Sequence, residues 1–124
     1  MSVHQQVLAK VNVPVDKGMK ELVEALSLFP ELQTIESDEG KKDGWAWVCF
    51  VYGDQEKPHS WKPLSEFVFS MVGPKLVEEF GDRIDINVKV TESGSYRAEM
   101  AIQKETIPAV VSLLKKLSRE SLAA

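Results

Sequence analysis

The stretch that most constrains the fold is Trp45–Tyr52, eight residues that include no charged side chain and no polar one except the Tyr52 phenol. It contains two of the three tryptophans and the only cysteine of the chain. A short run of aromatic and β-branched residues between glycines, here Gly44 and Gly53, is typical of a strand buried on both faces. We therefore predict a central β-strand here, around which the other elements pack.

Other segments alternate apolar and polar residues, as half-buried strands do. Val11, Val13 and Val15 indicate one such strand, with Pro14 near its end because proline has no amide to donate. The polar, glycine-containing residues 37–44 suggest a hairpin that leads into the tryptophan strand. We expect strands at residues 7–15, 32–36, 45–52, 84–91 and 96–102.

Apolar residues at helical spacing predict three helices. Asp16 is the expected N-cap of the first helix, and Pro30 ends it because the residue before a proline avoids the α conformation. Gly73 and Pro74 interrupt the second, which predicts either a kink or two helices with Pro74 opening the second. Thr106 is the expected cap of the third. The ranges are 16–29, 64–80 and 106 to the C-terminus.

The predicted element order is β-α-β-β-α-β-β-α, and its first six elements are the split βαβ pattern of the ferredoxin-like fold. We expect an α+β fold, residues 1–124 as one domain, with 1–6 and 120–124 frayed. The sheet is expected to be antiparallel in the order 4-1-3-2, with both helices on one face. The tryptophan strand is then internal, a fifth strand lies beside the fourth, and the last helix returns to the helical face.

The tryptophan strand conflicts with the polar outer face of the other strands. Either Ala46, Val48, Phe50 and Tyr52 face the helices, or their neighbours do, and the pattern leaves both registers open. Each tryptophan carries about 150–250 Å² of surface, and an exposed patch of that size is often functional. The expected binding face consists of Trp45, Trp47, Cys49, Val51, Asn12, Lys89 and Arg97.

Self-association is the function we expect of this face, because a twofold dimer is the commonest soluble oligomer. The predicted protein is thus a binding or assembly module that forms a homodimer through its aromatic sheet face. A ligand cleft, cover by the N-terminal segment or the Gly73–Pro74 break, and a small enzyme with a site between subunits remain alternatives.

Composition excludes several classes of partner. The net charge of −4 argues against a general nucleic-acid or anionic-membrane binder, and no apolar run is long enough to span a membrane. One cysteine forms no internal disulfide, and we expect Cys49 to be a buried thiol in a reducing, cytoplasmic location. His59, Asp54 and Glu56 are expected to form a solvated loop. We expect no metal and no cofactor.

Residues 44–50 resemble the RNP1 segment of RNA-recognition motif domains, in which glycine and aromatic residues alternate before a valine. The resemblance implies that Trp45 and Trp47 stack on unpaired bases of single-stranded RNA. The sequence departs from that family at Asp43, where the pattern has a basic residue, and at Asn12, where the first strand should carry an aromatic one.

A second resemblance covers residues 22–40. It is similar to a segment of small uncharacterised bacterial proteins and of wybutosine-synthesis methyltransferase relatives, whose hairpin carries Thr-x-x-Ser-Cys-x-Gly. Asp38 stands at the cysteine position here, so no site is carried over from that group.

Overall fold

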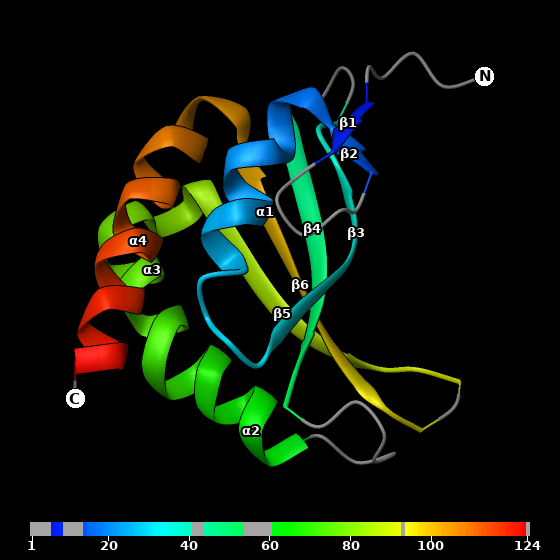
Figure 1. The fold of residues 1–124 in the computed structure, drawn as a ribbon, viewed down its shortest axis with the longest axis vertical. Coiled ribbons are helices and arrows are strands. Elements are labelled where there is room, and N and C mark those ends of the chain that lie inside the picture. The colour runs from blue at the N-terminus through cyan, green and yellow to red at the C-terminus, as the bar shows by residue number, and fades with distance from the viewer. Residues whose placement is uncertain (1–5, 9–13, 41–43, 54–60, 93, 124) are drawn as a thin grey trace.

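The computed structural model describes residues 6–8, 14–40, 44–53, 61–92 and 94–123 (Figure 1). Within them the chain alternates between strands and helices. The strands are β1 (Gln6–Leu8), β2 (Pro14–Asp16), β3 (Leu32–Asp38), β4 (Trp45–Tyr52), β5 (Ile84–Val90) and β6 (Tyr96–Gln103). The helices are α1 (Lys20–Leu26), α2 (Trp61–Glu66), a π-helical segment (Phe67–Val72), α3 (Gly73–Phe80) and α4 (Ile107–Ala123), with short 3-10 turns at Lys17–Met19, Gly81–Arg83 and Lys104–Thr106.

The architecture is α+β: a four-stranded antiparallel sheet in the order β3-β4-β6-β5 with the helices gathered on one of its faces (Figure 1). The prediction of an internal tryptophan strand is confirmed, since β4 lies between β3 and β6. No helix in the described part of the chain is long and apolar enough to cross a membrane.

The strand order differs from the ferredoxin-like order predicted above. That order places strand 7–15 beside the tryptophan strand, on the side away from β3. In the structure β6 occupies this position beside β4, and β1 pairs with β2 in a separate two-stranded sheet. The pairing of β6 with β4 has a packing reason. Ala98, Met100 and Ile102 of β6 are buried on the helical side, opposite Phe50, Val48 and Ala46 of β4.

The core lies between the helices and the inner side of the sheet. Phe67 of the π-helical segment is at its centre, with its ring centroid 5.0 Å from that of Phe29, 5.7 Å from Phe50 and 4.5 Å from Tyr52. The first two pairs meet edge to face and the third is stacked, geometries that aromatic rings prefer. Phe67 therefore connects the segment after α1, strand β4 and the long helical region.

The predicted break at Gly73–Pro74 is present, in the form of two helices. Pro74 lies in the first turn of α3, where its missing amide costs no hydrogen bond. Residues 67–72 wind as a π-helix, which brings the Val68 carbonyl against Gly73 so closely that a Cβ there would overlap the oxygen. Glycine at position 73 is therefore a steric requirement of this junction.

Two predicted helix caps and one predicted helix end are wrong. Asp16 belongs to β2 and does not cap the first helix, which begins at Lys20 after a 3-10 turn. This helix ends at Leu26 rather than Phe29, because the next two amides, of Leu28 and Phe29, bond to carbonyls only three residues back. The last helix begins at Ile107, and Thr106 is not its cap, since the Thr106 hydroxyl is buried without a hydrogen-bond partner.

Candidate binding face

The sheet face turned away from the helices, here called the open face, carries alternate residues of each strand. In β4 the helical side consists of Ala46, Val48, Phe50 and Tyr52, which pack in or against the core. The register that the sequence left open is thereby settled. Trp45, Trp47, Cys49 and Val51 belong to the open face.

The open face is less apolar than the sequence suggested. Trp47 is 36% exposed, Trp45 and Val51 are only partly exposed, and Cys49 is fully buried. Strand pairing places Cys49 between Glu36 of β3 and Glu99 of β6. The strand neighbours of β4 therefore cover part of the surface that the sequence pattern left bare.

A β-bulge in β3 decides which residues reach this face. Thr34 pairs with Phe50 and Glu36 pairs with Cys49, so Ile35 is an extra residue between them. With a regular ladder, Ile35 rather than Glu36 would oppose Cys49, and the Glu36 carboxylate would be directed toward the core. The bulge keeps both Glu36 and Asp38 on the open face.

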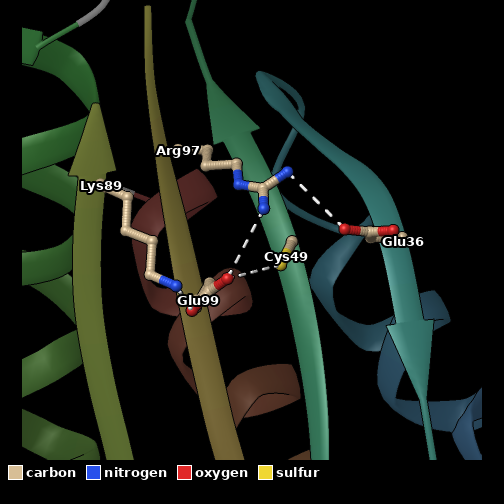
Figure 2. A network of polar contacts seen from close by, with 5 residues as sticks. All are labelled: Glu36, Cys49, Lys89, Arg97 and Glu99. Carbon is tan, nitrogen blue, oxygen red and sulfur yellow. Dashed lines mark hydrogen bonds and ion pairs between the residues drawn. The ribbon is translucent and has the colours of Figure 1, made fainter. Parts of the chain in front are cut away.

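Four charged side chains and the Cys49 thiol form one network on the open face (Figure 2). Lys89 Nζ lies 2.7 Å from Glu99 Oε2, and Arg97 lies 3.6 Å both from Glu99 Oε1 and from Glu36 Oε1. The Cys49 thiol donates a hydrogen bond of 3.5 Å to Glu99 Oε1. The network joins all four strands of the sheet (Figure 2), and the Cys49 side chain within it is fully buried.

The network sets the protonation states of its two central groups. Burial, and after it the negative charge of the neighbouring Glu99 carboxylate, raise the pKa of the Cys49 thiol from 9.0 to about 11. A hydrogen bond from Lys89 holds the pKa of Glu99 below its usual value. At neutral pH the thiol is therefore protonated and the carboxylate ionised, so Cys49 is not an activated nucleophile.

An open concavity of about 400 Å³ lies beside this network, over the row of Trp47, Ala101 and Asp85. Among the described residues, the charged side chains that line it are all acidic. The lining residues are Glu36, Trp47, Asp85, Asn87, Glu99, Met100 and Ala101. Asp85 is exposed and makes no ion pair with any residue that the structure describes. The concavity thus combines an indole ring with carboxylates.

The structure brings together six of the seven residues predicted for the binding face. Trp45, Trp47, Cys49 and Val51 lie on β4, while Lys89 and Arg97 belong to the ion network. Asn12 lies outside the described residues, as does the loop of Asp54, Glu56 and His59. Among the described residues, no group of three potential ligands could hold a metal ion.

Sequence reasoning missed the acidic half of the site. The alternation of β5 and β6 indicates that Asp85 and Glu99 lie on the outer side of their strands, but their meeting with Glu36 depends on strand order and on the bulge. It also missed a second apolar surface on the helices, where Trp61, Phe69, Met71 and Val77 are all exposed.

Comparison of the chain with protein-family models, with curated proteins and with solved structures found no match.

Proposed function

We propose that the protein is a binding module and that its open face receives a cationic segment of another protein. The observation that carries this proposal is the position of Trp47, which is 36% exposed and lines a concavity where the described charged residues are all carboxylates. Lysine and arginine head groups bind over the face of an indole, and nearby carboxylates add Coulomb attraction.

Asp85 is the carboxylate best placed to meet an incoming cation. Glu99 already interacts with Lys89 and Arg97, whereas Asp85 makes no ion pair with any described residue. Trp47 and Asp85 belong to one row of the sheet, with Ala101 of β6 between them. Two strand spacings, about 10 Å, separate their backbones, and an arginine side chain of a bound segment spans that gap over the small Ala101.

The two other occupants considered from the sequence fit this face less well. Single-stranded RNA would bring phosphates beside Glu36, Asp85 and Glu99, which Coulomb repulsion opposes. Face-to-face pairing of two copies, the arrangement expected from the sequence, would remove the Lys89–Glu99–Arg97 network from water at a desolvation cost. A cationic segment avoids the repulsion and leaves the network at the rim.

Titration with short peptides tests the proposal. An acetylated Gly-Arg-Gly-Arg-Gly amide is added to 15N-labelled protein, and the indole signal of Trp47, assigned with Trp47→Phe, is followed by NMR. We expect shifts confined to the open face, and binding weakened about two- to fivefold by Asp85→Asn. The same peptide with citrulline, the uncharged analogue of arginine, is the matched control, and Trp61→Phe is the control variant.

Four results contradict the proposal. If the citrulline peptide binds as tightly as the arginine peptide, charge has no role in binding. If the Asp85→Asn variant binds the arginine peptide as tightly as the wild type does, the carboxylate has no role. Binding of single-stranded RNA with strong salt dependence at Trp47 favours the nucleic-acid alternative. Shifts of the same signals with protein concentration alone, before any peptide is added, favour self-pairing through this face.

A further inference from the structure

Strand β5 is an edge of the sheet. It pairs with β6 on one side, and no described strand pairs with its other side. An edge strand presents a row of backbone donors and acceptors to which another strand can pair. Its side chains alternate: Asp85, Asn87 and Lys89 are exposed, whereas Ile84 is buried and Ile86 and Val88 are partly buried on the helical side.

The sequence of β5 is complementary to itself in antiparallel orientation. When two copies of Ile84–Val90 are paired with Asn87 opposite Asn87, Asp85 of each copy lies opposite Lys89 of the other. Opposite charges directly across an antiparallel pair are stabilising. On the other side of the strand, Ile86 meets Val88 and Ile84 meets Val90. Charged residues thus pair with charged ones, and apolar residues with apolar ones.

The helices cover the two ends of β5 unequally. Helix α3 contacts β5, but α2 contacts β4 and β6 instead, and Trp61 of α2 lies 5.2 Å from the ring of Tyr96. The helical region therefore crosses from the edge of the sheet toward its middle along the length of β5. The exposed fraction of the residues on the helical side of β5 is accordingly low at the covered end, 5% at Ile84, and high at the other end, 66% at Val90.

The covered end of β5 has an apolar groove of about 500 Å³ between the strand and the helices. Phe69 and Val77 line it and are each 53% exposed, and Ile84 and Ile86 line its strand side. In the antiparallel pairing, the exposed Val90 of one copy lies opposite Ile84 of the other and so enters this groove. The two α3 helices lie at opposite ends of the joined strands, so they do not meet.

We propose that two copies of this chain pair through their β5 edges about a twofold axis at Asn87, forming one continuous eight-stranded sheet from two four-stranded ones. Val90 of each copy fills the groove beside Ile84 of the other. Lys89 has three ammonium donors, so it pairs with Asp85 of the second copy while keeping its contact with Glu99. Asp85 has two carboxylate oxygens, so one of them still faces the cationic segment proposed for the open face. The axis is perpendicular to the sheet, and both open faces point to the same side.

Sedimentation equilibrium of the full chain tests this pairing. We expect a dimer for the wild type, and a rise of the dimer Kd by about tenfold or more for Val90→Asp, because the carboxylate would enter the apolar groove of the second copy. Val90 is 66% exposed within one copy, so this variant leaves the fold intact. Leu28→Asp, at a position 45% exposed away from β5, is the matched control and keeps the dimer.

A charge exchange gives the sharpest result. Asp85→Lys and Lys89→Asp each place like charges opposite one another and weaken the dimer, while the double variant restores the opposite-charge pairs and dimerises more tightly than either single variant. Hydrogen exchange of the outward amides of β5 slows with protein concentration in the wild type.

A monomer at several hundred micromolar, a dimer unaffected by Val90→Asp, or failure of the double variant to restore pairing overturns the proposal. Trp47→Ala separates it from the function proposed for the open face, because that variant weakens peptide binding and leaves the edge-paired dimer unchanged.

Discussion

Ionisation of the buried Cys49 thiol provides a quantitative test of the ion network. Burial and the Glu99 carboxylate raise the thiol pKa from 9.0 to about 11, so the folded state disfavours the thiolate. Below its unfolded pKa the thiol is protonated in both the folded and the unfolded state, so it does not lower the free energy of unfolding there. We therefore expect wild-type stability to fall, relative to a chain without this thiol, as the pH rises from about 9 toward 11.

The magnitude follows from the two pKa values. Their difference of about two units corresponds to about 2.7 kcal/mol once the thiol is ionised in both states. At about pH 10.5 the unfolded thiol is ionised and the folded one mostly is not, so about 2 kcal/mol of the free energy of unfolding is lost. Near pH 8 the loss is close to zero.

Urea denaturation of wild type and Cys49→Ala at both pH values isolates this effect. The alanine variant has a cavity whose cost is the same at each pH, and the other titrating groups are common to both chains. We expect the wild type to lose about 2 kcal/mol more than the variant between about pH 8 and pH 10.5. Parallel pH dependence of the two chains would refute the reasoning.

Two stability predictions concern the helical region. Phe67→Ala removes a ring with three aromatic neighbours and is expected to lower the free energy of unfolding in urea by about 3–5 kcal/mol, whereas Phe69→Ala, 53% exposed, costs less than about 1 kcal/mol. Equal costs would contradict the central position of Phe67. Gly73→Ala forces a methyl group against the Val68 carbonyl and is expected to lower the free energy of unfolding by at least about 1 kcal/mol in thermal denaturation. The control Lys75→Ala, at an exposed position, is expected to change it by less than about 0.5 kcal/mol. An unchanged stability of Gly73→Ala would contradict this prediction.

The sequence predicted the elements well where one periodicity dominated. The alternation of residues 84–91 and 96–102 identified β5 and β6, and the apolar run identified β4. It did not predict which strands pair, because alternation reports a buried side and not a neighbour. Strand 7–15 was therefore placed inside the sheet, whereas its described residues form β1 and β2, paired with each other.

The binding face was predictable in its apolar residues and in the cations Lys89 and Arg97, but not in its carboxylates. Trp47 and Cys49 are neighbours along one strand, so their shared face follows from a period of two residues. The carboxylates of Glu36, Asp85 and Glu99 come from three other strands, and their meeting depends on pairing registers that have no local sequence signal.

The bulge in β3 has a consequence for how this chain tolerates changes in length. Ile35, 44% exposed, is surplus to the ladder, so an in-frame loss of its codon would join Thr34 to Glu36 and leave every later pairing with β4 as it is. Loss of a single codon within β4 would instead shift the strand by one place and exchange its two faces. The chain can therefore lose one residue at position 35 without a change of strand register, whereas β4 cannot lose any residue without one.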